Sequence, residues 1–387
     1  MNPINPINPM NLEIIDPTNY AGWDDLLLST PGYSFFHSSA WAKVLKDSYG
    51  YTPMYFDTIK NGQFSALVPV MEVNSFITGK RGVSLPFTDY CEPIINANVE
   101  FIDLFNNIIE YGKKRGWKYV ELRGGDRYLR NQESGARKQE ARSSNLNPET
   151  WNLNPASSPY TLHPTPCPFS AYLGHTLDLT GGEEKILSSL RDSTKRNIKK
   201  AIKEGVAVKI LNSLESVKEF YRLNCLTRKE HGLPPQPYYF FQKIYDHIVS
   251  RDLGSIALAS YKGRNIAGAV FFHFSDKAIY KYGASDMKFQ DLRANNLAMW
   301  EGIRWFCNNG YKSFCFGRTE VENKGLQQFK AGWGTVEQSI HYFKYDFRKK
   351  EFIKDSLEFK NIYHYVFKKM PAPLLNIVGS SLYRHVA

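Results

Sequence analysis

The sequence has few cysteines, no long apolar run and fewer acidic than basic side chains. Its five cysteines are odd in number and widely spaced, with no Cys-x-x-Cys pair and no Cys/His pattern typical of a zinc site. This argues against a disulfide framework, and we expect no bound metal and a reducing compartment. No apolar stretch approaches the roughly 20 residues of a membrane-spanning helix, and the N-terminus lacks the basic start and apolar core of a signal peptide. We therefore expect a cytoplasmic protein.

Positive charge exceeds negative charge. Lys and Arg number 49 against 38 Asp and Glu, which gives a formal net charge of +11 over 387 residues. Such an excess indicates an anionic partner, which would be nucleic acid, a phosphorylated metabolite or an acidic membrane surface, unless it serves solubility alone. The length is enough for two ordinary domains, and the 24 Tyr, 25 Phe and 7 Trp supply material for large cores.

Two parts of the chain carry the same order of predicted elements. Each begins with a hairpin whose turn contains a glycine, Gly62 in the first part and Gly263 in the second, and each continues with a helix and a strand. The hairpin strands and the helix are expected at 53–59, 64–73 and 101–115, and again at 255–261, 266–274 and 293–309. The repetition favours tandem copies of one α/β (α+β) unit, although so common an order would also arise by chance.

The domain boundaries follow from this repeat. The first copy is expected at 12–179 and the second at 180–348, with a C-terminal tail at 349–387. Residues 1–11 repeat Asn-Pro-Ile and are predicted to be a disordered leader. Residues 126–170 are rich in proline and polar side chains and show neither helical nor strand periodicity, so they are predicted to be a disordered insertion in the first copy.

The densest charge run in the sequence lies on a predicted helix. Thr180 and Glu183 have capping-box spacing, and the helix is expected from Glu183 to Glu204, closed by Gly205. Its candidate phosphate-binding cations are Arg191, Lys195, Arg196, Lys199 and Lys200. A solvated helix usually mixes charges of both signs, so this run favours a phosphate-rich partner such as an RNA backbone or a nucleotide diphosphate. The alternative is a basic face that is merely exposed to solvent.

A lysine at the end of another predicted helix is the most informative single residue. Lys330 is followed by Gly332-Trp333-Gly334, and the strand before its helix stops at Gly317-Arg318. Two cations at a strand end and a helix end are a typical way for an α/β protein to face an anion or a developing oxyanion. The alternatives are a surface lysine beside a turn for Lys330 and a structural ion pair for Arg318.

The other candidate binding residues have structural alternatives as well. Arg228, near a predicted helix end, would bind a substrate phosphate or else interact with the helix dipole. Trp41 and Tyr282 are site residues only if they face a cleft, because aromatic side chains more often belong to a core. No general base stands out, and Asp89 and Glu320 are left open for that role.

Four segments of the chain resemble the FemAB-type aminoacyl- and acyltransferases of the GNAT-like superfamily. They are Phe36–Trp41, Leu190–Val206, Tyr280–Ser285 and Phe316–Gly334, and the likeness extends over about residues 20–347. The resemblance implies two tandem GNAT-type domains, each a mixed, mostly antiparallel twisted sheet flanked by helices. It also implies transfer of an acyl or aminoacyl group to an amine of a cell-envelope or polysaccharide-type precursor.

The resemblance assigns roles to individual residues. Lys330 matches the lysine that the family places at the reaction centre, and Tyr280 and Tyr282 match an aromatic pair that lines the substrate channel. No Ser-His-Asp or Cys-His constellation stands out, so we expect direct attack by the amine, with Lys330 stabilising the oxyanion. The acyl donor, either acyl-CoA or aminoacyl-tRNA, would be a co-substrate and not a bound cofactor.

Two departures from the family pattern keep rival functions open. Family members that act with tRNA have a long helical arm, and this sequence shows no extended heptad stretch that would form one. Whether tRNA is a partner is therefore left open. Arg293 and Asn295 stand where CoA-dependent GNAT enzymes have glycines, which weakens but does not exclude an acyl-CoA-dependent N-acetyltransferase. A non-catalytic RNA- or polyanion-binding module on the same fold is the third hypothesis.

The acceptor under the first hypothesis would be phosphate-bearing or lipid-linked. The tail at 349–387 then has two interpretations. It makes peripheral contact with the inner face of a membrane, or it packs against the second domain, which is the favoured interpretation. The oligomeric state is left open.

Overall fold

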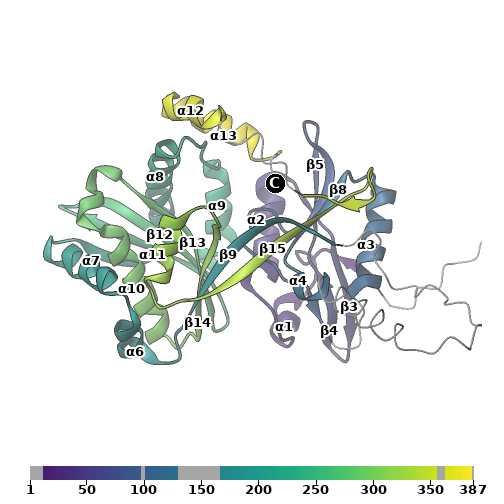
Figure 1. Ribbon diagram of the computed structural model, residues 1–387, viewed down its shortest axis with the longest axis horizontal. Coiled ribbons are helices and arrows are strands. Elements are labelled where there is room, and N and C mark those ends of the chain that lie inside the picture. The colour runs from purple at the N-terminus through teal and green to yellow at the C-terminus, as the bar shows by residue number, and fades with distance from the viewer. Residues whose placement is uncertain (1–11, 97–100, 130–165, 355–361, 386–387) are drawn as a thin grey trace, which may run out of the picture.

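The computed structural model describes residues 12–96, 101–129, 166–354 and 362–385. The predicted leader and the central part of the predicted insertion lie outside these ranges. Figure 1 shows two α/β halves side by side, with the long strands β9 and β15 running between them and the C-terminal helices along one edge.

Within its described residues, the first half contains four helices and eight strands. In chain order these are β1 (Glu13–Ile15), α1 (Trp23–Leu28), α2 (Ser39–Tyr49), β2 (Thr52–Pro53), β3 (Tyr55–Lys60), β4 (Gln63–Val68), β5 (Met71–Ser75), β6 (Gly79–Val83), β7 (Ile94–Ile95), α3 (Phe101–Arg115), β8 (Tyr119–Arg123) and α4 (Asp126–Leu129). A 3-10 turn, η1 (Phe35–His37), precedes α2.

The remaining elements belong to the second half and the tail. They are β9 (Pro168–Asp178), α6 (Gly182–Ser189), α7 (Asp192–Lys203), β10 (Ala207–Leu211), α8 (Leu214–Glu230), α9 (Tyr238–His247), β11 (Gly254–Tyr261), β12 (Arg264–Phe274), β13 (Lys277–Ser285), α10 (Ala294–Asn308), β14 (Ser313–Glu320), α11 (Lys324–Ala331), β15 (Val336–Asp346), β16 (Glu351–Phe352), α12 (Ile362–Lys369) and α13 (Ala372–Leu382). Within the described ranges, no helix has both the length and the hydrophobicity needed to cross a membrane.

Both predicted hairpins form, and their turns have the same backbone. β3 and β4 meet at Asn61 and Gly62, with φ of 52° and 72°, and β11 and β12 meet at Lys262 and Gly263, with φ of 48° and 75°. Positive φ at two consecutive residues is typical of a type I′ turn, whose twist matches that of the flanking strands. The helices predicted after each hairpin are α3 and α10. The predicted α/β architecture, with mostly antiparallel strands and flanking helices, is confirmed.

A continuous sheet joins the two halves. Its strand order is β10-β11-β12-β13-β14-β9-β15-β8-β6-β5-β2, and a smaller sheet has the order β1-β3-β4-β7. β9 pairs antiparallel with β14, and β15 lies between β9 and β8. The last long strand of the second copy therefore extends the sheet of the first. The predicted boundary after residue 179 falls directly behind β9, which is paired within the second half.

Two predicted boundaries differ from the structure. The single basic helix is two helices, α6 and α7, because Leu190 and Arg191 have extended backbone and Leu190 turns into the core. Leu187, in the last turn before the break, is 43% exposed. The two ends of the segment predicted as a disordered insertion, 126–170, belong to regular elements, since α4 begins at Asp126 and β9 at Pro168. Pairing of β9 with β15 orders residues 168–170.

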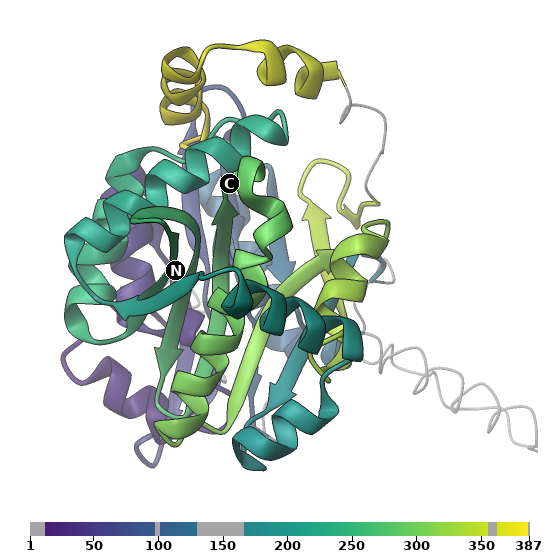
Figure 2. The ribbon, with the colours of Figure 1, turned by 90° about the vertical axis from the view of Figure 1, so that its left-hand side faces the viewer.

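The core spans both halves. On one face of the second-half sheet, α8 and α9 pack together with side chains from the first half, and α10 covers the opposite face (Figure 2). Trp41 of α2 is 0% exposed and contacts Phe240 of α9 and Phe272 of β12, while Phe35 stacks on Phe272 with ring centroids 4.8 Å apart. Burial of these rings favours docking of one half on the other.

We expect the two halves to unfold together, because they share the larger sheet and an aromatic core. Denaturant unfolding, followed both by far-ultraviolet circular dichroism and by tryptophan fluorescence, should give one coincident transition. Two transitions separated between the probes would show that each half is stable alone.

Candidate active site between the two halves

The sheet opens between β13 and β14. These parallel neighbours pair from Lys277 opposite Ser313 to Ile279 opposite Cys315. Beyond that point β13 stays paired with β12, and β14 stays paired with β9, so the two strands separate. An irregularity in each ladder lies at the opening: Lys281 is the extra residue of β13, and β14 shifts register between Cys315 and Arg318.

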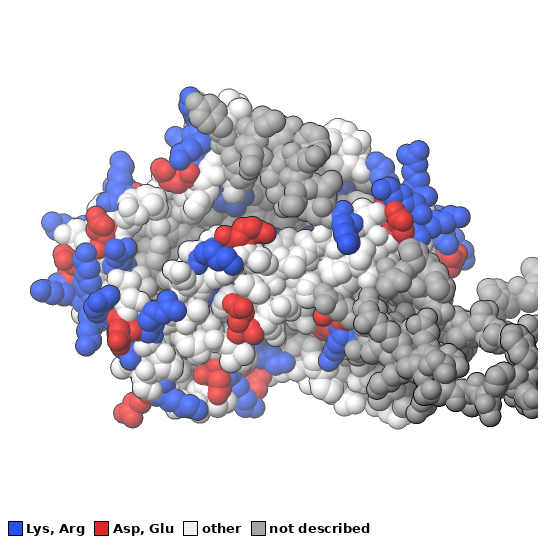
Figure 3. Space-filling view, in the orientation of Figure 1, with Lys and Arg blue, Asp and Glu red and all other residues white. Residues whose placement is uncertain are grey.

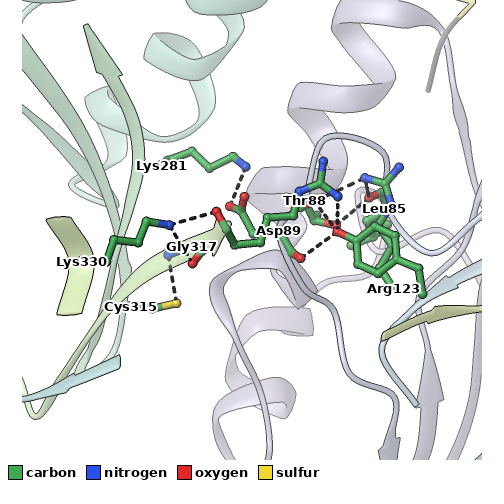
Figure 4. A network of polar contacts seen from close by, with 10 residues as sticks. Leu85, Thr88, Asp89, Arg123, Lys281, Cys315, Gly317 and Lys330 are labelled. Atoms are coloured by element: carbon green, nitrogen blue, oxygen red, sulfur yellow. Dashed lines mark hydrogen bonds and ion pairs between the residues drawn. The ribbon is translucent and has the colours of Figure 1, made fainter. Parts of the chain in front are cut away.

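Lys330 extends into this opening from the last turn of α11. The helix is capped by Asn323, whose side chain accepts a hydrogen bond from the N–H of Leu326. The Lys330 side chain is 2% exposed, and its Nζ donates to the carbonyl oxygens of Gly317 at 3.1 Å and Arg318 at 2.9 Å (Figure 4). Burial lowers the pKa of this ammonium to about 8, against the opposing attraction of Asp89.

An ion pair from opposite halves lies beside the ammonium. Asp89, in the loop between β6 and β7, accepts a hydrogen bond at 2.8 Å from the Nζ of Lys281, which the bulge of β13 directs inward (Figure 4). Burial by itself would raise the pKa of Asp89. The ammonium of Lys281, with Arg318 and Lys330 nearby, nevertheless holds that pKa below its usual range. Tyr342 of β15 donates to the Asp89 carbonyl oxygen at 2.7 Å and fixes the loop.

Gly317 is required by this arrangement. Its φ of +68° lies in the left-handed region that side chains disfavour, and a Cβ there would come 3.2 Å from Asp89 Cγ. Its N–H donates to Cys315 Sγ and its carbonyl oxygen accepts from Lys330. A glycine therefore lets β14 pass closely between the lysine and the carboxylate.

Two pockets include neighbours of Lys330 in their lining, although Lys330 itself lines neither. The first lies between the halves and is lined by Phe36, Asp89, Thr176, Lys277 and Gly317, among others. The second lies in the second half, and its lining residues include Thr227, Tyr280, Ser285, Asn295, Met299 and Phe329. Lys330 follows Phe329 of the second pocket in sequence, and its Nζ contacts Gly317 of the first.

The basic segment, α6 and α7, packs on the turn that follows Lys330. The N–H of Arg191 donates to the Gly332 carbonyl oxygen at 3.0 Å. A Cβ at Gly332 would come 2.7 Å from Thr194 Oγ1, and one at Gly334 would come 2.5 Å from Ser189 Oγ. The two glycines thus let α6 and α7 pack directly on this turn, which explains the break between the helices.

A family model described as an acetyltransferase (GNAT) domain matches residues 188–331, which include α7, the sheet opening and Lys330. Among curated proteins, the chain is 31% identical over 111 residues to a lipid II:glycine glycyltransferase of Staphylococcus haemolyticus, covering 27% of this chain and 26% of that protein. It is 29% identical over 101 residues to the Staphylococcus epidermidis protein of the same name, covering 24% of each. The chain thus matches about a quarter of the length of these relatives.

Residues 188–331 therefore match a GNAT-type acetyltransferase domain, and part of the chain is similar to FemAB-type glycyltransferases. Solved structures agree with that fold. The crystal structure of FemX matches with a TM-score of 0.62 at 14% identity, covering 86% of this chain and 97% of FemX. A tandem GNAT protein from the clavulanic acid biosynthesis pathway matches with a TM-score of 0.52 at 9% identity, covering 87% and 98%. The predicted tandem GNAT architecture is confirmed.

The structure brings some of the predicted site residues together. Tyr280 lines the second pocket. Arg318 lies at the opening, where its guanidinium stacks 4.2 Å from the Tyr172 ring centroid and donates to Tyr342 Oη at 2.8 Å. Aromatic faces and a hydroxyl therefore hold this cation, in place of the ion pair that was its alternative.

Three other predicted residues have packing roles. Trp41 is enclosed in the core, where no substrate reaches it. Tyr282 packs among the rings of Phe240, Phe241 and Phe272 in the same core. The guanidinium of Arg228 donates to the Pro234 carbonyl oxygen and to Tyr383 Oη, and so joins α8 to the C-terminal tail. Its predicted phosphate contact therefore competes with two protein acceptors.

The candidate polyanion-binding cations of α7 remain together on the surface. Arg191, Arg196, Lys199 and Lys200 are exposed, and Lys195 is half-buried with its Nζ donating to the Ser188 carbonyl oxygen. Figure 3 shows basic side chains gathered over this end of the second half. The N-terminal end of α7 packs on the turn behind Lys330, while these cations remain exposed or half-buried.

Sequence reasoning did not single out Lys281, Tyr172 or Tyr342. Strand alternation places Lys281 on the opposite face from Tyr280 and Tyr282, and the bulge that turns it toward Asp89 has no sequence signal. Asp89 was considered as a base and not as an ion-pair partner. The first pocket is lined by residues of both halves. A local sequence pattern does not predict such contact between distant parts of the chain.

We expect Gly317→Ala to lower kcat/KM by at least about tenfold, because the methyl group strains the backbone and displaces Asp89 from Lys281. The matched control is Gly205→Ala, at φ +82° with no atom within 4 Å of a Cβ, which introduces the same strain away from the site. Steady-state kinetics and denaturant unfolding of both variants separate the two effects. Equal kinetic losses in the two would remove Gly317 from the site.

Proposed function

We propose that the protein transfers an aminoacyl group to an amine of a lipid-linked cell-envelope precursor. The observation that carries this proposal is the Lys330 ammonium, which is buried at the sheet opening and bonded to Gly317, a lining residue of the first pocket. The curated relatives are named lipid II:glycine glycyltransferases, which supports an amine on a lipid-linked acceptor and an amino acid as the transferred group. One pocket would hold the acceptor and the other the donor.

Transfer would proceed by direct attack. The acceptor amine attacks the carbonyl carbon of the aminoacyl ester, a C–N bond forms, the ester C–O bond breaks, and the proton lost by the amine ends on the leaving hydroxyl. An ammonium has three N–H donors, and Lys330 uses two on Gly317 and Arg318, so a third remains for the oxyanion of the tetrahedral intermediate. A donor placed in this way stabilises the transition state by about 3–4 kcal/mol.

Asp89 is better suited to positioning than to proton transfer. Its carboxylate is ion-paired with Lys281, and its lowered pKa makes it a weak base. Because Asp89 comes from the first half and Lys281 from the second, their ion pair holds the two walls of the opening at a fixed separation.

The basic face of α7 supports aminoacyl-tRNA as the donor. Its exposed cations adjoin the turn behind Lys330, where the phosphates of a nucleic acid would pass if its aminoacylated end entered the opening. This face also suits the third hypothesis, a non-catalytic polyanion-binding module, but such a module has no use for a buried lysine beside a pocket.

An acyl-CoA donor is the second candidate. Arg293, which stands where CoA-dependent enzymes have a glycine, adopts φ +57° at the start of α10, so the backbone keeps a glycine-like turn despite its side chain. Asn295 in the first turn of α10 lines the second pocket. A pyrophosphate at this helix start would follow ordinary anion-binding geometry.

We expect Lys330→Ala to lower kcat/KM by about 10²–10³-fold, because the oxyanion loses its charged donor. The assay follows radiolabelled amino acid passing from aminoacyl-tRNA to lipid II, with acetyl-CoA as the alternative donor in a parallel reaction. Lys324→Ala, at the exposed start of the same helix, is the matched control and should keep wild-type activity. Wild-type rates in folded Lys330→Ala would remove this residue from the mechanism, and product from acetyl-CoA alone would favour the second candidate.

The pH dependence should follow the ionisation of Lys330. Since burial lowers its pKa to about 8, the ammonium is present below that pH and is lost as the pH rises through it. We therefore expect kcat/KM measured from pH 6 to 10 to fall above about pH 8. A rate that rises through the same pH, and that loses this rise in Lys330→Ala, would instead make the neutral amine a general base.

A further inference from the structure

Exposed apolar side chains gather along one edge of the molecule, away from the sheet opening. Phe76 and Ile77 occupy the turn between β5 and β6 and are 89% and 58% exposed. Val366 of α12, with Leu374 and Ile377 of α13, is also exposed, and Ile377 reaches 66%. Figure 1 shows α12, α13 and the β5 hairpin on the same upper edge, and in Figure 2 the two helices again lie along the top. We call Phe76, Ile77, Val366, Leu374 and Ile377 the apolar ridge.

Packing of α13 on the rest of the protein holds its part of the ridge at the surface. α13 packs through Leu375, which is buried, and through Gly379, where a side chain would collide with the Pro235 carbonyl oxygen. The opposite face of α13 carries Leu374 and Ile377, so the helix is held with these two side chains directed outward.

The end of the chain joins α13 to the hairpin. His385 contacts Ser75 Oγ at 3.0 Å, and its carbonyl oxygen accepts from Arg81 Nη2 at 2.8 Å. The Phe76 ring packs edge-on against the His385 ring. The tail therefore connects the second-half helices to the first-half hairpin, and the ridge spans both halves as one surface.

The charged side chains of the tail that contribute to the ridge region have one sign. From residue 359 to the C-terminus the sequence contains no Asp or Glu, whereas Lys368, Lys369 and Arg384 lie on or beside α12 and α13 and are exposed. Lys80 and Lys118 flank the base of the hairpin, where Lys118 Nζ donates to the Thr78 carbonyl oxygen. Exposed large apolar side chains with a basic surround are the composition of an interfacial membrane surface.

We propose that the apolar ridge docks on an anionic lipid bilayer. The apolar side chains enter the boundary between headgroups and acyl chains, and the lysines and Arg384 contact the lipid phosphates. The ridge lies outside the matched GNAT segment, 188–331, so attachment and catalysis reside in different parts of the chain. Docking itself does not depend on the proposed function. The further idea that docking brings the first pocket toward a lipid-linked acceptor rests on the proposed function.

The test is flotation of the full chain with vesicles of phosphatidylcholine containing phosphatidylglycerol, compared with vesicles of phosphatidylcholine alone. The variant Phe76→Ser/Ile377→Ser removes one exposed side chain from each half of the ridge. The control is Val336→Ser, which removes a 73% exposed apolar side chain at the start of β15. Both variants change exposed positions, so folding should persist, and circular dichroism checks it.

We expect the wild-type chain and Val336→Ser to float with the anionic vesicles, with weaker binding to phosphatidylcholine. The double variant should lose roughly a hundredfold in partitioning, about tenfold for each buried apolar side chain. A wild-type chain that stays in solution, or a double variant that floats equally well, would overturn the proposal. So would a ridge-dependent dimer in sedimentation without vesicle binding, since a second copy would then cover the surface.

Transfer to a water-soluble acceptor analogue separates this proposal from the proposed function. The double variant should retain wild-type kcat/KM with that analogue and lose rate only with the acceptor in vesicles. Absence of transfer to either acceptor by a wild-type chain that floats would count against the proposed function and leave docking standing.

Discussion

The buried ammonium of Lys330, held by the carbonyl oxygens of Gly317 and Arg318, is the interaction around which this structure is organised. A buried cation is costly unless its donors are satisfied, and two backbone acceptors with the nearby Asp89 carboxylate supply that compensation. The acceptors lie where β14 departs from β13, so the lysine is bound by the same irregularity that opens the sheet. Its lowered pKa leaves it charged at neutral pH but sensitive to its surroundings.

Both halves are needed to hold this charge in place. The second half supplies Lys330, Lys281 and β14, while the first supplies Asp89 on a loop that Tyr342 of β15 fixes from the shared sheet. β15 pairs with β8 of the first half, and both halves contribute to one aromatic core. These contacts oppose relative movement of the halves. Tandem duplication thus provides a second wall for a site that a single GNAT-type unit would leave open to water, where an ammonium stabilises an oxyanion much less.

Local signals predicted much of the fold. Asn61-Gly62 and Lys262-Gly263 marked both hairpins, the periodicity of α3 placed its bounds, and resemblance directed attention to Lys330. Features that depend on distant contacts were missed. The bulge that turns Lys281 toward Asp89, the break at Leu190 caused by docking on the Gly332–Gly334 turn, and the placement of β15 between β9 and β8 all arise from tertiary packing. Arg228 and Trp41 had suitable chemistry, but packing gave them other partners.

The central claim is that the Lys330 ammonium contacts the carbonyl oxygen under attack. A crystal structure of the full chain with a phosphonate that links an aminoacyl-adenosine mimic to the acceptor amine tests it most directly, because the phosphonate oxygen occupies the position of the oxyanion. The account predicts this oxygen at about 3 Å from Lys330 Nζ, with the two arms of the analogue in the two pockets. An analogue bound with that oxygen more than about 6 Å from Nζ, or with both arms in one pocket, would contradict it.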